Sequence, residues 1–479
     1  MNNGGIVFIA LPFKNSSFFE RFGISINPSN TTNINSQGLI SDNRFLRNIR
    51  IQLPQETFGA TSLDLKFSDD WKILIRYLFP SLQPLLITRE FGKGAIVYWN
   101  SDCLRLRDFR GYFLFSLLSA QKIGAMSIFN STLFQIDDSP PPSYGIESVF
   151  PILGEPVDDQ KFFLTEWYQE VLDLLSLRGI KPTHFLCFRY SGQKTEDFFK
   201  DSDRNPFFKK ILDLIEARGN EIGLHGYNHI PLISKKPFQD EKKNQKFMKR
   251  SLESAKKLWK TYDLPVPKVY VPPNNQIDSF GKAMLREIFP SIREICGSYS
   301  GFFEQGNPSE MCDEIGPEKN DASCFNIPRF SRGYFPDHST TFSIMNGVLG
   351  HGLINHFIQP DEVFDPKRGK NLPWELLLQG LENLLSFFEK LLPDSKKFYT
   401  GDFLIPLKNF LQDEVHFYII DQNHLKIVSK TIGRNWFYIF SKNKPLTISG
   451  GKIYPTDFSP NFFHIQIFEK AAIISFVKN

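Results

Sequence analysis

The chain has 479 residues, of which 41% are hydrophobic and 23% charged, so it is long enough for two or three domains with a sizeable core. Its formal net charge of +4 comes from charges of both signs spread along the chain, which gives no reason to expect nucleic-acid binding. No apolar run approaches the roughly 20 residues of a membrane-spanning helix, and no signal peptide is visible, so the sequence leaves the compartment open.

Residues 1–125 alternate short apolar runs with amphipathic or polar stretches, which predicts an N-terminal α/β domain. The glycines of Phe91-Gly-Lys-Gly94 predict the turn of a hairpin between two apolar runs. We expect strands over 6–10, 85–88 and 95–99, helices over 70–79 and 110–121, and a polar loop over 27–48.

From residue 126 to 396, apolar runs of strand length alternate regularly with amphipathic stretches of helix length. This rhythm predicts right-handed crossovers and a parallel sheet, either open or closed into a barrel. We expect strands over 131–136, 183–188, 220–224 and 268–271, and helices over 165–178, 206–218, 239–262 and 374–392.

Residues 397–479 change in character. Their apolar runs are short and are separated by Asn, Asp, Gly and Pro, a pattern typical of a small all-β module. We expect strands over 415–420, 425–428, 436–440 and 473–477.

Two short stretches in the middle of the chain carry the groups that divalent-metal hydrolysis requires. Asp137 is followed by Asp138, and His225 is followed four residues later by His229. Imidazoles and a carboxylate are suitable ligands for the ion, and a second carboxylate can handle protons. Each pair follows an apolar run predicted to be a strand, and functional groups collect at the carboxyl ends of parallel strands.

Each pair also has a simpler interpretation. The aspartates precede Ser-Pro-Pro and fit the cap of a turn, and two histidines four residues apart also occur on solvated loops. The predicted strand before each pair favours a metal site. His184, His338 and His351 are further candidate ligands, but nothing in the sequence selects them.

Four local motifs occur in order between residues 130 and 395. They are Gln135-Ile-Asp-Asp-Ser-Pro-Pro141, Glu221-Ile-Gly-Leu-His-Gly-Tyr-Asn-His229, Val271-Pro-Pro-Asn-Asn275 and Ile354-Asn-His-Phe-Ile-Gln-Pro-Asp361. Together they resemble the polysaccharide deacetylase superfamily, which has a NodB-like homology domain. The chain is similar to a bacterial subset in which this domain follows an amidotransferase-like α/β region and precedes a β-rich tail. The resemblance implies a distorted (β/α) barrel over 126–396, between an α/β domain and a small all-β module.

The resemblance also implies roles for individual residues. Asp138, His225 and His229 would hold a divalent metal, for which zinc suits the ligand set best. Asp137 would be the base and His356 the acid.

The third motif of the family usually carries an arginine that steadies the base, and Val271-Pro-Pro-Asn-Asn275 has none. Arg189 or Arg329 would have to replace it, and Asn274 is a candidate hydrogen-bonding partner. Asp361 is a candidate for orienting a neighbouring group.

The leading hypothesis is a metal-dependent carbohydrate deacetylase acting on a polysaccharide or oligosaccharide. A second hypothesis is a catalytically inactive glycan-binding protein that keeps the barrel and the metal, and the missing arginine favours it. A third is a glycosidase that uses paired carboxylates such as Asp137 and Glu166 and needs no metal.

Overall fold

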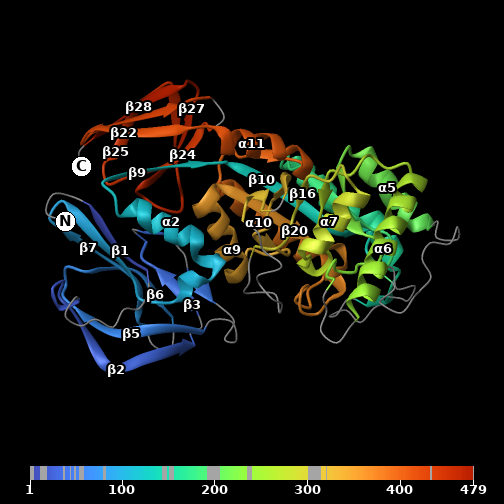
Figure 1. The fold of residues 1–479 in the computed structure, drawn as a ribbon, viewed down its shortest axis with the longest axis horizontal. Coiled ribbons are helices and arrows are strands. Elements are labelled where there is room, and N and C mark those ends of the chain that lie inside the picture. The colour runs from blue at the N-terminus through green and yellow to red at the C-terminus, as the bar shows by residue number, and fades with distance from the viewer. Residues whose placement is uncertain are drawn as a thin grey trace.

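The computed structural model describes residues 5–10, 19–35, 38–43, 45–47, 50–52, 59–78, 82–142, 148–149, 156–190, 205–234, 240–299, 314–319, 321–431 and 434–477. Within these ranges the chain has a mixed α/β fold (Figure 1). None of the helices there is long and apolar enough to cross a bilayer.

The N-terminal strands form a six-stranded sheet in the order β1-β8-β7-β6-β3-β4, in which only the β1–β8 pair is parallel. The strands are β1 (Ile6–Ile9), β3 (Gly38–Ser41), β4 (Arg50–Gln52), β6 (Lys72–Tyr77), β7 (Pro84–Phe91) and β8 (Gly94–Trp99). A separate pair joins β2 (Ile24–Asn35) to β5 (Gly59–Phe67). The expected hairpin is confirmed as β7 and β8, and the helix over 110–121 is α2 (Arg110–Ser119).

Two expectations for the N-terminal region are wrong. The predicted helix over 70–79 is strand β6, because Ile73, Ile75 and Tyr77 alternate with Lys72 and Arg76 in the period of a strand and neighbouring strands pair with both of its edges. The polar stretch over 27–48 contains most of β2 and all of β3, so tertiary pairing there outweighs low hydrophobicity.

The central sheet has the order β17-β18-β16-β15-β14-β13-β10-β20-β19, and all of its pairs are parallel except β17–β18. A further short strand, β21 (Lys396–Phe398), pairs with the beginning of β10. The other strands are β10 (Ser131–Ser139), β13 (Pro182–Cys187), β14 (Glu221–Gly226), β15 (Val269–Tyr270), β16 (Glu294–Ile295), β17 (Gly316–Glu318), β18 (Asp321–Asn326), β19 (Ser331–Arg332) and β20 (Leu353–Ile358).

The two ends of this curled sheet are joined by the segment that runs from β18 to β19. On one side, the amides of Ile327 and Arg329 donate to carbonyls of residues 295 and 297, which belong to or follow β16. On the other side, the amides of Phe330 and Gly333 donate to carbonyls of β20. Arg329 therefore lies on the segment that brings the far edge of the sheet back to β20 and β10.

Helices pack around the central sheet, and polar caps mark the beginnings of several of them. The side chains of Asn205, Asp240, Asp278 and Asp337 accept hydrogen bonds from backbone amides of the first turns. The helices are α3 (Asp159–Phe162), α4 (Tyr168–Leu177), α5 (Pro206–Ala217), α6 (Glu241–Thr261), α7 (Ser279–Ile288), α9 (His338–His351), α10 (Trp374–Leu391) and α11 (Leu404–Gln412). The expected helices over 206–218, 239–262 and 374–392 are confirmed, and the one over 165–178 is divided between a π-helical turn (Phe163–Trp167) and α4.

The C-terminal strands form two four-stranded sheets with an apolar layer between them that includes Ile427, Phe437, Ile465 and Ile474. One sheet has the order β22-β23-β28-β25, and the other β26-β27-β24-β9. The strands are β22 (Val415–Asp421), β23 (His424–Ser429), β24 (Trp436–Ser441), β25 (Lys444–Ser449), β26 (Gly451–Pro455), β27 (Phe462–Ile467), β28 (Ala471–Val477) and β9 (Ile123–Ile128). The four expected strands are confirmed, and β9, from much earlier in the chain, completes the second sheet.

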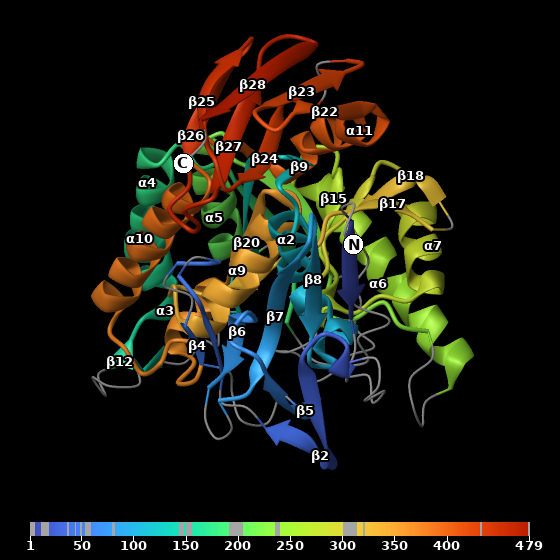
Figure 2. The same cartoon turned by 90° about the vertical axis from the view of Figure 1, so that its left-hand side faces the viewer.

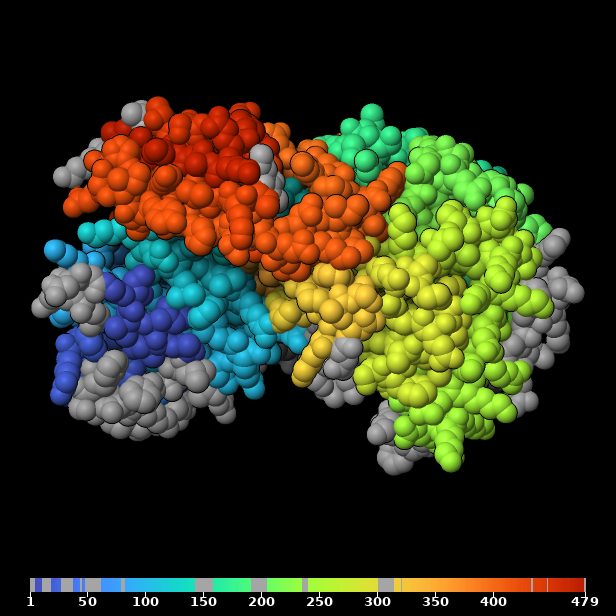
Figure 3. Space-filling model, turned by 45° about the horizontal axis from the view of Figure 1, so that its top comes forward, coloured from blue at the N-terminus to red at the C-terminus, as the bar shows by residue number. Residues whose placement is uncertain are grey.

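The three parts of the chain pack closely. Helix α2 crosses α9 at Gly111, whose amide donates to the Asn346 side chain over 2.7 Å. The hydroxyl of Tyr438 in β24 donates to the carbonyl of Val348 in α9. Figure 2 shows β6, β7 and β8 in front of α9, with the C-terminal strands above them. In Figure 3 the orange and red C-terminal residues cover cyan residues on one side and reach the yellow residues of the central part.

Candidate active site

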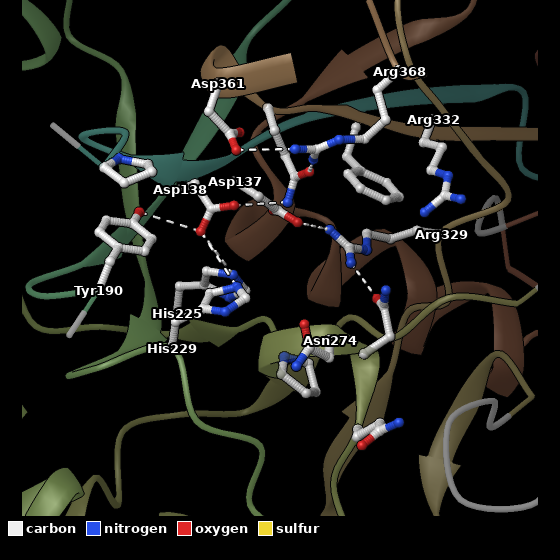
Figure 4. Close-up of a pocket in the computed structure, with 16 residues that line it drawn as sticks. Asp137, Asp138, Tyr190, His225, His229, Asn274, Arg329, Arg332, Asp361 and Arg368 are labelled. Atoms are coloured by element: carbon white, nitrogen blue, oxygen red, sulfur yellow. Dashed lines mark hydrogen bonds and ion pairs between the residues drawn. The ribbon is translucent and has the colours of Figure 1, made fainter. Parts of the chain in front are cut away.

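A pocket of about 730 Å³ opens at the carboxyl ends of the central strands. This is the edge at which parallel α/β sheets place functional groups. Figure 4 shows the lining side chains, with Tyr190 and the two histidines on one side of the aspartates and three arginines on the other. The lining residues are Asp137, Asp138, Pro142, Tyr190, His225, His229, Pro272, Asn274, Asn275, Gln276, Arg329, Arg332, Phe357, Gln359, Asp361 and Arg368.

An irregularity near the end of β10 brings Asp137 and Asp138 to the same pocket. In a regular strand, adjacent side chains point to opposite faces of the sheet. The pairing of β10 with β13 shifts register between Ile136 and Ser139, and Asp138 has a positive φ of 50°. A bulge of this kind turns a side chain toward a new direction, and both carboxylates line the pocket as a result.

Strand β14 supplies His225, and the turn that follows supplies His229. The Nδ1 atom of His225 lies 2.8 Å from the carbonyl oxygen of Val271, so this nitrogen donates, and in the neutral imidazole Nε2 then keeps its lone pair. The Nε2 atoms of His225 and His229 lie 3.4 and 3.5 Å from Oδ1 of Asp138. His229 has a positive φ of 52°, a conformation that costs energy for a residue other than glycine and often marks a functional site.

One potential ligand atom from each of Asp138, His225 and His229 lies within 4.8 Å of the other two. Within the described ranges, no other group of three or more His, Cys, Asp and Glu residues has this spacing. Nε2 of His225 is buried and has no hydrogen-bond partner in the described part of the chain. An orphaned imidazole nitrogen beside a carboxylate and a second imidazole fits the ligand set of a divalent cation. The sequence-predicted ligands are therefore together, and they suit a metal.

Asp138 is buried and is held on both of its oxygens. The Tyr190 hydroxyl donates to Oδ1 over 3.2 Å, and the Gln359 amide donates to Oδ2 over 2.7 Å. Burial alone would raise the pKa of Asp138, but the two imidazoles and the Tyr190 hydroxyl hold that pKa below its ordinary value. For His229, burial and the charge of His225 lower the pKa, which favours the neutral, metal-binding form.

Arg329 provides the contact that the third motif lacks. Its guanidinium donates to Oδ2 of Asp137 and to Oδ1 of Asn275, and it lies 3.7 Å from the centre of the Phe357 ring. The side chains of Arg329 and Asp137 are 1% and 2% exposed, so this ion pair is shielded from water. Asp137 lines the pocket, and its Oδ1 is buried without a partner within the described residues.

The third aspartate of the pocket, Asp361, lies in the first turn of the short 3-10 helix Pro360–Phe364, which follows β20. Its Oδ2 accepts a hydrogen bond of 3.0 Å from Arg368, and its Oδ1 has no partner in the described structure. Burial and the charge of Asp138 raise the pKa of Asp361 to about 6, against the opposing effect of Arg368. Asp361 therefore holds a proton more readily near neutral pH than an ordinary aspartic acid.

His356, the expected acid, is not among the residues that line the pocket. This residue is completely buried, with Nδ1 2.7 Å from the Ser331 hydroxyl and Nε2 2.8 Å from the Gly333 carbonyl oxygen. Its ring packs between Phe134 and Phe388, on the side of the sheet that α10 covers. Since side chains alternate along a strand, the next residue, Phe357, faces the pocket instead. Burial lowers the pKa of His356 to about 3, which favours the neutral imidazole at neutral pH.

Other sequence candidates have mixed outcomes. Asn274 lines the pocket, although it is Asn275 that contacts Arg329. Arg189 lines a neighbouring cavity of about 440 Å³ with Pro140 to Pro142. Glu166 is exposed on the π-helical turn and does not line the pocket, so it does not form the carboxylate pair with Asp137 that the glycosidase hypothesis named. The three further histidines, His184, His338 and His351, also lie outside the pocket lining.

Sequence reasoning missed Tyr190, Asn275, Gln359, Arg332 and Arg368. Tyr190 and Gln359 follow the ends of β13 and β20, so their positions after parallel strands were an available signal. Asn275 adopts a left-handed conformation with a φ of 55°, which no motif marks. The two arginines reach the pocket only through tertiary folding.

The chain belongs to the family described as "Uncharacterised protein conserved in bacteria (DUF2194)", whose model matches residues 5–459. No match was found among curated proteins.

Among solved structures, the chain is similar to a Mycobacterium smegmatis protein assigned as a polysaccharide deacetylase, at 14% identity and a TM-score of 0.35, over 58% of this chain and 90% of the other. It is also similar to a CE4 family pseudoenzyme from Bacillus anthracis, at 10% identity and a TM-score of 0.31, over 57% and 65% of the two chains. A chitin deacetylase from the fungal pathogen Colletotrichum lindemuthianum gives 11% identity and a TM-score of 0.30, over 58% and 89%.

Proposed function

We propose that the chain is a metal-dependent hydrolase that removes acetyl groups from a polysaccharide or oligosaccharide. The observation that carries this proposal is the buried Nε2 of His225, which has no hydrogen-bond partner among the described residues and lies beside His229 and Asp138. Two imidazoles and a carboxylate suit zinc best and leave positions for water and substrate. The finer fold assignment is part of the same proposal: a deacetylase-like distorted (β/α) barrel over 126–396, an amidotransferase-like α/β domain over 1–125 and a β-rich module over 397–479.

A divalent ion held by Asp138, His225 and His229 would supply Lewis acidity toward the acyl carbonyl and toward a water molecule. Asp137 is the base that accepts the proton of the attacking water, because it lines the pocket and its Oδ1 is unpaired within the described structure. Arg329 keeps Asp137 in place and balances its charge, and Asn275 accepts a second hydrogen bond from the same guanidinium. Addition of water to the carbonyl carbon and cleavage of its C–N or C–O bond then release acetate.

The departing amine or alkoxide needs a proton, and His356 cannot deliver it. We assign this role to Asp361, which lines the same pocket and has an unpaired Oδ1 within the described residues. Its pKa of about 6 leaves a usable protonated fraction near neutral pH. Arg368, bonded to the other oxygen of Asp361, fixes the direction in which the free oxygen points.

Two measurements test the proposed function. The purified chain should bind about one zinc ion per molecule by elemental analysis, and His225→Ala should abolish this binding. Acetate release from an acetylated hexosamine oligosaccharide should require the metal and should fall by at least about 100-fold in Asp137→Asn, as expected for loss of a general base. His416→Ala, on exposed strand β22, is the matched control and should behave like the wild type. Full activity in chelator, or unchanged activity in Asp137→Asn, would refute the assignment.

The alternative is a glycan-binding protein without turnover. The absence of an arginine from Val271-Pro-Pro-Asn-Asn275 favoured it, but Arg329 now supplies a cation to Asp137. This alternative predicts saccharide binding that survives Asp137→Asn, together with metal binding and no acetate release from the wild type.

A further inference from the structure

A second cavity of about 290 Å³ adjoins the candidate active site. The two cavities share three lining residues, Arg332, Phe357 and Arg368. If one unit of a chain-like ligand occupies the first cavity and reacts there, the next unit of the same ligand would therefore lie in the second cavity. The volume lies at the lower end of the range for small-molecule sites and suits one such unit.

Positive charge dominates this second cavity. Its lining includes four cationic side chains, Arg332, Lys367, Arg368 and Lys370, and two carboxyl groups, Asp337 and Glu362. Asp337 already forms an ion pair of 2.7 Å with Lys370.

Burial raises the pKa of Glu362 to about 7, so at neutral pH its negative charge is only partly developed. The cavity lining therefore carries more positive than negative charge, although Arg368 also pairs with Asp361 and Asp365 from outside the lining. An anionic group is the ligand that this excess attracts.

The cavity also offers surfaces that suit a sugar. Phe335 and Phe357 present aromatic rings next to the cations, and a pyranose ring can pack its C–H face against such a ring. The hydroxyl of Ser343, which is 4% exposed, and Oε2 of Glu362, which is 2% exposed, have no hydrogen-bond partner within the described residues. Buried polar atoms normally form hydrogen bonds, so these two atoms suit a ligand with hydroxyl groups.

We propose that this cavity is a subsite for a sugar unit bearing an anionic group, next to the unit that is deacetylated. The substrate class is then an acidic glycan, such as one in which acetylated hexosamine alternates with hexuronic acid. Arg332 and Lys367 receive the anionic group, and Ser343 and Glu362 pair with ring hydroxyls. This proposal rests on the proposed function for its reacting unit, but the subsite itself is tested by binding alone.

The experiment measures dissociation constants by calorimetry with the full-length Asp137→Asn chain, which prevents turnover. The ligand is an oligosaccharide of N-acetylhexosamine and hexuronic acid, and its matched control is the same oligosaccharide with each carboxyl reduced to an alcohol. We expect the acidic form to bind at least about tenfold more tightly, as one charge-assisted hydrogen bond provides, and the preference to shrink as salt rises. A sulfated hexosamine oligosaccharide tests whether sulfate can supply the negative charge; binding tighter than the reduced control would also support the subsite.

Variants then assign the preference to the cavity. Arg332→Gln combined with Lys367→Gln should remove the advantage of the acidic ligands and leave the reduced ligand unaffected, and Arg332→Lys should restore part of it. Lys396→Gln is the control, since β21 begins beside Ser131, at the opposite end of β10 from the pocket.

Equal affinity for acidic and reduced ligands, or equal losses for both in the double variant, would overturn the subsite. These results are independent of acetate release. Deacetylation of neutral and acidic chains alike, without any binding preference, would refute the subsite and leave the proposed function intact.

Discussion

The ion pair between Arg329 and Asp137 gives the sharpest test of how the site is built. We consider Arg329→Met, which keeps a long side chain but removes the guanidinium, together with Asp137→Asn and the combined variant. In the native chain each charge is almost fully buried and is balanced by the other. Each single substitution leaves one buried charge without its partner.

The magnitude follows from this burial. Removing one partner of a buried ion pair costs about 3–5 kcal/mol, because the remaining charge is desolvated and uncompensated. Arg329→Met also removes the donor to Asn275, which adds about 1 kcal/mol. The double variant contains neither charge, so it should be more stable than the sum of the two losses predicts, by about 2 kcal/mol or more.

Urea unfolding followed by tryptophan fluorescence, with chelator present in all samples, measures this coupling. The control is the cycle of Arg178→Met and Glu389→Gln, whose side chains are 24% and 45% exposed. That exposed pair should couple by less than about 1 kcal/mol. If the losses for Arg329 and Asp137 simply add, to within about 0.5 kcal/mol, the buried pair does not hold the base as described.

Two further predictions concern stability outside the pocket. Gly111→Ala would push a methyl group into the Asn346 carbonyl where α2 crosses α9, so we expect the free energy of unfolding in urea to fall by about 1–3 kcal/mol. The control, Ser119→Ala, lies at the half-buried end of the same helix and should have little effect. Equal stabilities of the two variants would contradict the close approach of the two helices. Burial raises the pKa of Glu294 well above its ordinary value of 4.5, so the folded chain keeps a proton that the unfolded chain loses, and stability falls as pH rises above 4.5. Glu294→Gln should therefore raise the melting temperature at pH 8 and not at pH 4, with exposed Glu253→Gln as the control; a gain of equal size at both pH values would exclude titration as the cause.

Much of the central fold could be predicted because its elements are periodic and capped. The helices α5, α6 and α10 have long amphipathic repeats, and Asn205 and Asp240 mark the beginnings of two of them. The failures occur where local patterns are ambiguous. The run that forms β6 contains apolar residues at spacings that fit a helix or a strand, and only pairing with β7 and β3 decides between them. The placement of β9 in the C-terminal sheet was equally invisible, because that contact joins residues about 300 positions apart.

Some residues of the candidate site could also be predicted from the sequence, and others could not. Asp138, His225 and His229 were predictable because each belongs to a short motif at the carboxyl end of a strand. Asp138 and His225 lie near the ends of β10 and β14, and His229 lies in the turn after β14. Parallel strands bring such positions to one edge of the sheet. The sequence could not decide which arginine pairs with Asp137. Arg189 follows a strand and was as plausible as Arg329, but only Arg329 lies on the segment that returns to β20 and faces β10 from the opposite wall. Its position depends on how the sheet closes, which is a global property of the fold.

His356 shows why a motif can be found and its key residue misplaced. Within β20, alternate side chains face the pocket and the helices, so a shift of one residue exchanges the two environments. Asn355 and Phe357 face inward, where they contact Gln135 and Arg329, and His356 faces α10. The next inward position is Gln359, which binds Asp138 and has no acidic proton to give. If the chain hydrolyses an amide, the proton for the leaving amine must therefore come from beyond the strand. Asp361, two residues further on, has a raised pKa and an oxygen without a partner among the described residues, as Glu362 also does, but Asp361 is the one of the two that lines the pocket.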